Sequence, residues 1–308
     1  MSGSYPRNSG RLDQCARIGK TAIGGYDVAL AVPSTLDEAI DAVAGAPDAQ
    51  LLAGGTDFCV QVSFGLRRPT GVVSLRRVDD LRGWSADSDT ITIGASTTYT
   101  AMIEQLTGLL PALAGAARSV GSPQIRNMGT LGGNVATASP AGDTLPVLLG
   151  LDARVGLAGT TGRRSVALHD LVTGPKRTSM LPGEIIVDVT TRRPRGPQHF
   201  LKVGTRNAMV ISIASAAVGI DPEAETVSCA LGSVGPVPLR APQAEAFAAS
   251  EIDWAAMTAS DSALARFGSL AASEASPIDD HRSSAAYRRA AVAVIAERGL
   301  RRCLRDAG

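Results

Sequence analysis

One glycine-rich stretch, residues 129–143, constrains the fold of this chain more than any other. It reads Gly-Thr-Leu-Gly-Gly-Asn-Val-Ala-Thr-Ala-Ser-Pro-Ala-Gly-Asp, which is rich in small residues without being low in complexity. Gly132 and Gly133 have no Cβ, so the backbone there can take a positive φ and approach a ligand closely. Consecutive exposed amide N–H groups in such a loop form a concave anion site. We therefore predict that this second glycine segment holds a pyrophosphate, and that Asp143, at its end, caps a helix that begins there.

An earlier stretch, residues 51–57, strengthens this interpretation. It reads Leu-Leu-Ala-Gly-Gly-Thr-Asp, an apolar strand that runs into a Gly-Gly turn followed by a hydroxyl and a carboxylate. A single Gly-Gly turn is more often a simple link between core elements, but two such segments can clasp one extended dinucleotide from both sides. Residues 53–57, the first glycine segment, lack the Gly-x-Gly-x-x-Gly and P-loop patterns, as does the second. Arg67 and Arg68 follow it, and we expect them to be exposed surface residues.

Composition limits the classes of function. The chain has 308 residues, 44% of them hydrophobic, and a formal net charge of +1. This length supports a sizeable core and two or three domains. A near-neutral charge argues against a nucleic-acid or polyanion partner.

The cysteines and histidines give no pattern for a metal or catalytic centre. Cys15, Cys59, Cys229 and Cys303 are far apart and form no Cys-x-x-Cys motif, so an iron–sulfur or zinc site in this chain is not expected. The three histidines are equally scattered, and no catalytic residue is predicted. Residues 1–26 lack the apolar centre of a secretory signal, and no apolar run approaches the ~20 residues of a membrane span. We therefore expect a cytoplasmic protein.

The periodicity of the chain predicts mixed α and β structure in four parts. These are an N-terminal extension (1–25), a small α/β subdomain (26–76), a second subdomain (77–197) and a C-terminal domain (198–308). Thr35 and Glu38 fit a helix capping box. Strands are expected at 26–32, 50–53, 71–75, 91–95, 154–157, 165–168, 185–189, 199–206, 211–220 and 226–231. Helices are expected from Leu36, from 98 to 106, and at 111–120, 145–151, 242–249, 255–270 and 283–300. In the last helix, one apolar stripe is expected to face the core, made of Tyr287, Ala291, Val294 and Ile295.

The two glycine segments also carry a family resemblance. Ala-Gly-Gly-Thr-Asp at 53–57 and Thr-Leu-Gly-Gly-Asn at 130–134 resemble the paired FAD motifs of the molybdenum hydroxylases. The similar part is the flavin-binding medium subunit of xanthine dehydrogenase and carbon monoxide dehydrogenase. Gly-Ser-Pro-Gln-Ile-Arg-Asn at 121–127 and Ala-Ser-Pro-Ala-Gly-Asp at 138–143 extend the match, which runs from about Asp27 to the last helix. The resemblance implies an α+β fold: a two-subdomain FAD-binding fold of the PCMH type, then a C-terminal α+β domain with a three-stranded sheet and helices.

The resemblance also implies which residues hold the cofactor. By register with the family, Ala95 and Ile125 lie against the flavin, and Val120 stands where larger relatives carry a stacking aromatic. Lys202 matches a lysine near the pyrimidine edge, where a cation stabilises anionic reduced flavin, although a plain surface lysine on a strand is an alternative. A carboxylate only accepts hydrogen bonds, so Asp143 suits the adenosine ribose. The full predicted FAD-binding set is Leu51, Leu52, Ala53, Gly54, Gly55, Thr56, Asp57, Ala95, Val120, Ile125, Gly129, Thr130, Gly132, Gly133, Asn134, Val135, Gly142, Asp143, Ile185, Ile186 and Lys202.

The implied function is electron transfer within a larger complex. A large molybdopterin subunit hydroxylates the substrate, a small subunit carries two [2Fe-2S] clusters, and FAD on this chain passes electrons to NAD⁺, a quinone or oxygen. The partners imply a heterotrimer or a dimer of heterotrimers, and the wording at 121–127 leans toward a purine substrate such as xanthine. The alternatives are a carbon monoxide dehydrogenase medium subunit, a stand-alone flavin oxidase of the PCMH type, and an assembly protein without FAD.

Overall fold

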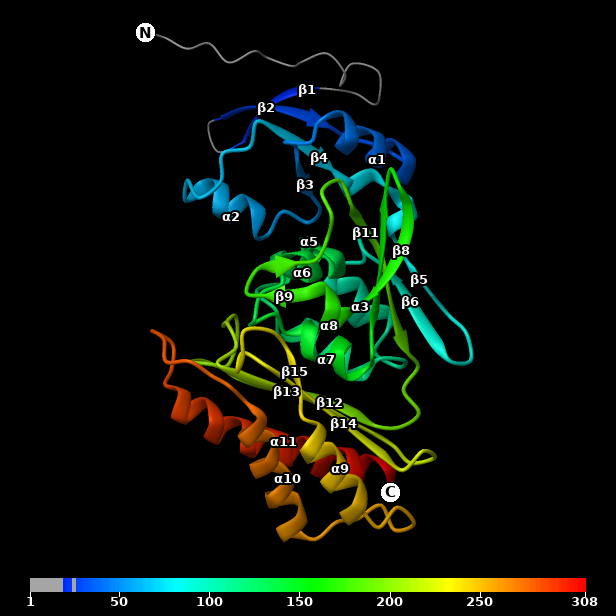
Figure 1. Cartoon of the computed structure of the whole chain (residues 1–308), viewed down its shortest axis with the longest axis vertical. Helices are drawn as coiled ribbons and strands as arrows, with labels where there is room; N and C mark the ends of the chain where they lie inside the picture. The colour runs from blue at the N-terminus through cyan, green and yellow to red at the C-terminus, as the bar shows by residue number, and fades with distance from the viewer. Residues whose placement is uncertain (1–18, 24–25) are drawn as a thin grey trace.

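The computed structural model describes residues 19–23 and 26–308, which stack in three parts along the long axis of the molecule (Figure 1). The first part is built on a four-stranded sheet in which β2, β4 and β3 run parallel and β1 pairs antiparallel with β2. In spatial order its strands are β1 (Gly19–Ile23), β2 (Tyr26–Ala31), β4 (Gly71–Ser74) and β3 (Gln50–Leu52). Strand β1 thus lies in the segment expected to be an extension, of which residues 1–18 and 24–25 lie outside the described residues.

Two helices accompany this sheet, α1 (Leu36–Gly45) and α2 (Phe58–Ser63). The predicted start of α1 is confirmed, because the Thr35 side chain accepts a hydrogen bond from the Glu38 N–H at 3.2 Å. Glu38 differs from a capping box in its partner, since its carboxylate accepts from the N–H and the hydroxyl of Ser34. Two 3₁₀ helices, η2 (Leu75–Arg77) and η3 (Asp79–Leu81), then lead into the second part.

The second part is a five-stranded antiparallel sheet packed against short helices. In spatial order its strands are β5 (Trp84–Ala86), β6 (Thr90–Gly94), β11 (Ile185–Arg192), β7 (Arg154–Gly159) and β8 (Gly162–Ala167), with a separate pair β9 (Val172–Gly174) and β10 (Arg177–Thr178). Its helices are α3 (Tyr99–Gln105), α4 (Pro111–Ser119), α5 (Pro123–Met128), α6 (Leu131–Thr137), α7 (Thr144–Gly150) and α8 (Leu168–Leu171).

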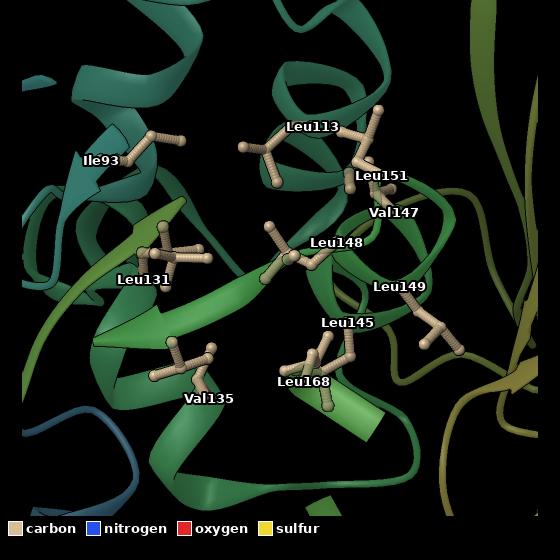
Figure 2. Packing of buried hydrophobic residues seen from close by; sticks show 14 of the residues in the cluster. Ile93, Leu113, Leu131, Val135, Leu145, Val147, Leu148, Leu149, Leu151 and Leu168 are labelled. Atoms are coloured by element: carbon tan, nitrogen blue, oxygen red, sulfur yellow. The ribbon is translucent and has the colours of Figure 1, made fainter. Parts of the chain in front are cut away.

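Apolar side chains from α6 and α7 fill the core of this part (Figure 2). Leu131 and Val135 on α6 and Leu145 and Leu148 on α7 are all almost inaccessible to solvent. Burying one such side chain stabilises a fold by about 1.5–3 kcal/mol. The sequence predicted an open loop for the second glycine segment, and that prediction is wrong. The middle of this segment forms α6, and that helix is held by the core on one side.

Strand β11 serves two cores at once. Ile186 and Val189 belong to the core of the second part, while Ile185 and Val187 pack with α1 and β4 of the first part. Neighbouring residues of a strand point to opposite faces of the sheet, which separates Ile185 from Ile186. A register shift against β7 between Ile186 and Asp188 inserts one extra residue in β11, and it returns Val189 to the face of Ile186. The first and second parts of the molecule are therefore joined by a shared strand as well as by their linker.

The C-terminal domain is a four-stranded antiparallel sheet covered on both faces. Its strands are β12 (Gln198–Val203), β13 (Ala214–Asp221), β14 (Thr226–Gly232) and the short β15 (Leu239–Arg240), one more than predicted. One face carries α9 (Pro242–Glu251), α10 (Asp261–Glu274) and α11 (Ala285–Ala307), and the other packs on α4 and α7 (Figure 1). The predicted hairpin is confirmed as β13 and β14.

Helix α11 faces the core with a different stripe from the predicted one. Tyr287 and Val294 are 53% and 44% exposed, whereas Arg288 is only 4% exposed. Ala291 and Ile295 are buried as predicted. The stripe is rotated because the Arg288 guanidinium finds hydrogen-bond acceptors inside the protein.

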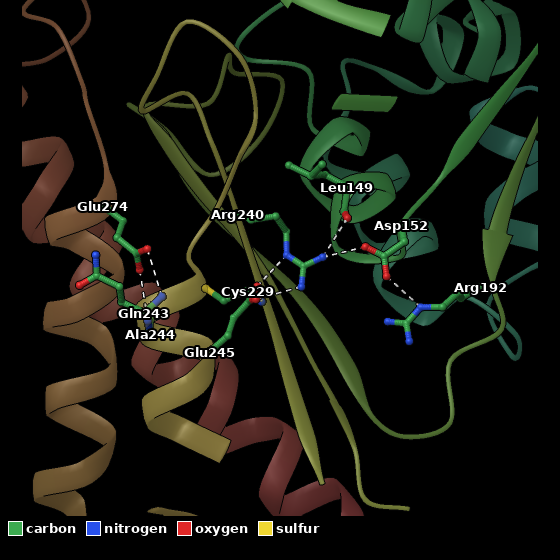
Figure 3. Close-up of polar contacts among 9 residues, drawn as sticks. All are labelled: Leu149, Asp152, Arg192, Cys229, Arg240, Gln243, Ala244, Glu245 and Glu274. Atoms are coloured by element: carbon green, nitrogen blue, oxygen red, sulfur yellow. Dashed lines mark hydrogen bonds and ion pairs between the residues drawn. The ribbon is translucent and has the colours of Figure 1, made fainter. Parts of the chain in front are cut away.

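A second arginine, Arg240, ties the C-terminal domain to the second part (Figure 3). Its guanidinium donates to Glu245 Oε1 at 2.7 Å and to Asp152 Oδ1 at 2.9 Å. Asp152 also pairs with Arg192, so the junction is a network of alternating charges.

Candidate cofactor site

A cavity of about 580 Å³ lies where the three parts of the molecule meet. This volume falls within the range of about 300–1,000 Å³ typical of cofactor and ligand sites. Most of the predicted FAD-binding residues line it, although they come from segments far apart in the sequence. These are Leu51, Ala53, Gly54, Gly55, Thr56, Asp57, Ala95, Val120, Ile125, Gly129, Thr130, Gly132, Gly133, Asn134, Gly142, Asp143 and Ile186.

The first glycine segment connects β3 to α2 and takes a conformation that needs glycine. Gly55 has a φ of +73°, and a Cβ built on Gly54 would lie 1.9 Å from the carbonyl oxygen of Met128. The two glycine segments are therefore in direct contact around the cavity. Within the described part of the chain, the amide N–H groups of Gly54, Gly55 and Thr56 donate to no protein acceptor. Free consecutive amides of this kind suit an anion.

The second glycine segment uses its amides differently from the prediction. The N–H of Gly132 donates to Ala95 O at 2.8 Å, that of Gly133 to Thr130 Oγ1 at 3.1 Å, and that of Asn134 to Thr130 O at 3.0 Å. These groups are already paired, and neither glycine has a positive φ. What the glycines provide is close approach, because a Cβ on Gly132 would lie 2.6 Å from Ala95 Cβ. The predicted cradle of free amides is thus wrong for residues 131–134.

Asp143 is buried at the cavity wall and does not cap α7 with its side chain. Its Oδ2 lies 2.5 Å from Lys202 Nζ and 2.8 Å from Ser119 Oγ, while its Oδ1 is buried without a hydrogen-bond partner. Burial raises the pKa of Asp143, against the opposing charge and hydrogen bonds of Lys202 and Ser119. An unpartnered buried acceptor on a residue that lines a cavity fits a ligand group that donates a hydrogen bond.

Four predicted residues lie outside the cavity lining. Leu52 packs beside the small core under α2, and Val135 and Ile185 are fully buried in the two larger cores. Lys202 lies behind Asp143, where its ammonium also donates to Ser119 O at 3.1 Å. Lys202 is therefore positioned by Asp143 as one member of an ion pair.

The sequence did not single out several residues that line the cavity. Tyr99 faces Gly129, where an added Cβ would lie 2.6 Å from its ring, and burial together with the charge of Asp143 raises the pKa of Tyr99. Arg67, interpreted from sequence as a surface residue, is exposed but reaches the rim, with its guanidinium 5.9 Å from the Phe58 ring centre. Other unpredicted lining residues are Ser96, Lys176, Met180, Met209, Val210 and Ile211. These residues belong to no local sequence motif. They come from separate segments that only the fold brings together.

This arrangement fits a dinucleotide better than a metal or a catalytic triad. The first glycine segment carries the amides without an acceptor among the described residues, Asp143 supplies a buried acceptor, and apolar side chains such as Ile186 and Met180 line the same cavity. Among the described residues, no cluster of His, Cys, Asp and Glu is placed to hold a metal ion. Neither does any helix within 19–23 and 26–308 have the length and apolarity to cross a membrane.

The family of the chain follows from two matching family models. Residues 26–191 match the FAD binding domain in molybdopterin dehydrogenase, and residues 199–303 match the CO dehydrogenase flavoprotein C-terminal domain. The chain therefore belongs to the FAD-binding subunits of the molybdenum hydroxylases, as the paired glycine motifs indicated.

Individual relatives cover most of the chain. It is 34% identical to the putative xanthine dehydrogenase FAD-binding subunit of Escherichia coli, over 69% of this chain and 76% of the relative. It is 33% identical to the nicotinate dehydrogenase FAD-subunit of Eubacterium barkeri, over the same shares of the two chains. Among solved structures, a chain of the reconstituted CO dehydrogenase from Oligotropha carboxidovorans superposes with a TM-score of 0.83 at 29% identity, covering 90% of this chain and 98% of that one.

Proposed function

We propose that this chain holds FAD in the cavity and serves as the electron-transfer subunit of a molybdenum hydroxylase, with the diphosphate at the first glycine segment. The observation that carries this proposal is the set of amides at Gly54, Gly55 and Thr56, which have no acceptor among the described residues and belong to a segment that lines the same cavity as the second glycine segment. A diphosphate is the anion that these donors suit.

The side chains around the cavity would orient the rest of the cofactor. Asp143 Oδ1 is free to accept a hydrogen bond, for which an adenosine ribose hydroxyl is suited. Ala95 and Ile186 offer an apolar surface to a ring system, and Lys202 holds Asp143 in place from behind. The chemistry that FAD supplies when bound is acceptance of electrons from iron–sulfur clusters and their delivery to NAD⁺, a quinone or oxygen.

The other redox centres belong to partner chains in this proposal. Among the described residues, no group of His, Cys, Asp and Glu side chains is placed to hold a metal, and the cysteines of the whole sequence are too far apart for a cluster motif. A large subunit with the molybdenum cofactor and a small subunit with [2Fe-2S] clusters would complete a heterotrimer, or a dimer of heterotrimers. Relatives are named as medium chains or FAD-subunits, which supports a multi-subunit assembly.

For the substrate of the complex we propose a purine such as xanthine. The Gly-Ser-Pro-Gln-Ile-Arg-Asn stretch and the relative from Escherichia coli support this choice. Carbon monoxide is the alternative, because a carbon monoxide dehydrogenase medium chain from Afipia carboxidovorans is 31% identical over 83% of this chain. The stand-alone oxidase is disfavoured, since neither glycine segment carries a His for flavin attachment.

The decisive experiment is to purify the native complex and release its flavin by denaturation. The proposal expects FAD at one per copy of this chain, molybdenum and iron in the copurifying partners, and reduction of the flavin by xanthine. Reduction by carbon monoxide instead would keep the FAD assignment and replace the purine. A complex without flavin, or with FMN, would overturn the proposal.

A further inference from the structure

Arg288, on the first turn of α11, is an almost buried cation outside the cavity. Its Nη1 donates to two carbonyl oxygens, Ile213 O and Ser233 O, both at 2.8 Å. Its Nη2 donates to Asp280 Oδ1 at 2.7 Å. A guanidinium has a rigid planar fork of donors, which is the group suited to holding several fixed acceptors at once.

The first carbonyl belongs to a segment that forms one wall of the cavity. Met209, Val210 and Ile211 line the cavity, and Ile213 lies two residues beyond them. Ile213 is fixed on both sides, because its N–H donates to Val203 O at 2.8 Å while its carbonyl accepts from Arg288. Met209 and Ile211 are themselves half exposed, so little apolar packing holds this wall.

The second carbonyl is connected to another stretch of the cavity lining, residues 139–143. Ser233 has a φ of +63°, and its N–H donates to Pro140 O at 2.9 Å. Pro140 lies between Ser139 and Ala141, and these two line the cavity together with Gly142 and Asp143. The Nη1 of Arg288 is therefore linked to both stretches of the cavity lining. It reaches residues 209–211 through Ile213, and residues 139–143 through Ser233 and Pro140.

We infer that Arg288 is a positioning residue for the cofactor: it sets the separation of the wall at 209–211 from the wall at 139–143, and with it the fit of FAD. This inference rests on the proposed function. A lysine at this position keeps the charge but has a single ammonium without the planar fork, so it cannot hold all three acceptors in the same geometry.

The test compares Arg288→Lys with Arg240→Lys in the full chain, purified within its complex. Arg240 is the matched control, because it also joins the C-terminal domain to the second part, yet its partners Glu245 and Asp152 do not line the cavity. We expect Arg288→Lys to raise the FAD dissociation constant about tenfold, the effect of losing one or two charge-assisted hydrogen bonds. It should also change the visible circular dichroism of bound FAD and speed amide hydrogen exchange at 206–213 and 139–143. Arg240→Lys should leave all three unchanged.

Thermal unfolding of both variants separates positioning from plain stability. If Arg288→Lys lowers the melting temperature but leaves the FAD affinity and spectrum at wild-type values, or if Arg240→Lys alters them equally, the inference is wrong. Wild-type complex that contains no FAD would instead refute the proposed function itself. Should Arg288→Lys fail to fold, Asp280→Asn removes the charge that holds Nη2. It is expected to weaken FAD binding to a smaller extent, and an unchanged affinity in that variant would overturn the inference.

Discussion

The two glycine segments look alike in sequence and differ in what their glycines do. In the first, Gly55 takes a left-handed conformation, and the amides of residues 54–56 have no acceptor within the part of the chain that the structure describes. In the second, Gly132 and Gly133 lie in an ordinary helix with paired amides, and they allow close approach to Ala95 and to the first segment. The first glycine segment thus presents backbone hydrogen-bond donors, and the glycines of the second segment allow neighbouring residues to pack closely.

This difference shows that a Gly-Gly pair predicts a close contact without saying what is in contact. A Cβ on Gly54 would collide with Met128, which is part of the protein and not of a ligand. The contact between the segments is therefore part of the folded protein before any cofactor arrives. Substitutions in the first segment should disturb backbone geometry, whereas those in the second should fill space.

The largest effect is expected for Gly54→Ala. Its methyl group would lie 1.9 Å from Met128 O, a backbone atom that cannot rotate away. We expect a loss of roughly 3 kcal/mol in unfolding free energy and protein without flavin, because the two segments must separate. Denaturant unfolding and the flavin-to-protein ratio measure both. Gly115→Ala in α4 is the control, since no atom lies within 4 Å of its added Cβ, and it should raise stability by up to about 1 kcal/mol because alanine favours a helix. Equal effects of the two variants would contradict the contact.

Gly133→Asp tests the second segment by charge. The new side chain would begin 2.9 Å from Thr130 Oγ1 and 4.0 Å from Ala53 Cβ, between the two segments. Like charges about 6 Å apart repel by a little under 3 kcal/mol at an effective dielectric of about 20, so FAD affinity should fall roughly 100-fold. Gly133→Asn has the same size without the charge and should lose less, as measured by flavin titration. An equal loss in both variants would assign the effect to size alone.

Gly55→Ala should have a smaller effect, through backbone strain. A left-handed conformation costs an L-residue about 1–2 kcal/mol, and the φ of Gly55 is +73°. We expect a similar loss of unfolding free energy and a roughly tenfold weaker FAD affinity, because the free amides would turn. Gly65→Ala, also at positive φ but with open space around it, controls for strain away from the cavity. It should lose stability and keep its FAD affinity.

The smallest effect concerns the buried carboxylate that ends the second segment. Burial raises the pKa of Asp143 above its ordinary 3.8, so the folded chain keeps this proton at a pH where the unfolded chain has released it. Asp143 then adds most to stability at low pH and less as pH rises. The stability deficit of Asp143→Asn should be larger at about pH 4 than at about pH 8 in denaturant unfolding. A deficit that grows with pH would mean that Lys202 outweighs burial.

Asp280 provides a comparison of opposite sign. Burial opposes its ionisation, but hydrogen bonds from the Arg282 N–H, Arg288 and the Ser283 N–H lower its pKa to about 2. Its contribution is present above the ordinary pKa of 3.8 and is lost as pH falls through about 2. The deficit of Asp280→Asn should therefore shrink on acidification over that range.

The sequence predicted most of the elements and the two motifs, because periodicity and capping are local signals. The pattern around Thr35 placed α1 correctly, and the Gly-Gly pairs marked both sides of the cavity. Helix α6 was missed because two glycines in its first turn argue against a helix, and only burial of Leu131 and Val135 compensates. Lys202 was predicted near the cofactor, and its partner Asp143 could be found only from the fold.

The unpredicted parts of the site depend on long-range packing. Lys176 and the wall at 209–211 reach the cavity from turns without a motif. The stripe on α11 was misassigned because an arginine is usually read as solvent-facing, whereas Arg288 is buried by three acceptors from distant segments. A single sequence gives no sign of where those acceptors lie.

The double use of β11 has a consequence for anyone who exchanges modules between relatives. Ile185 and Val187 belong to the core of a subdomain that ends, in the linear chain, far upstream of them. In a chimera that takes only residues 26–76 from a relative, the relative's side chains would pack poorly against Ile185 and Val187. Both sides of this interface should be exchanged together, so the suitable unit of exchange runs from residue 26 to the end of β11 at Arg192.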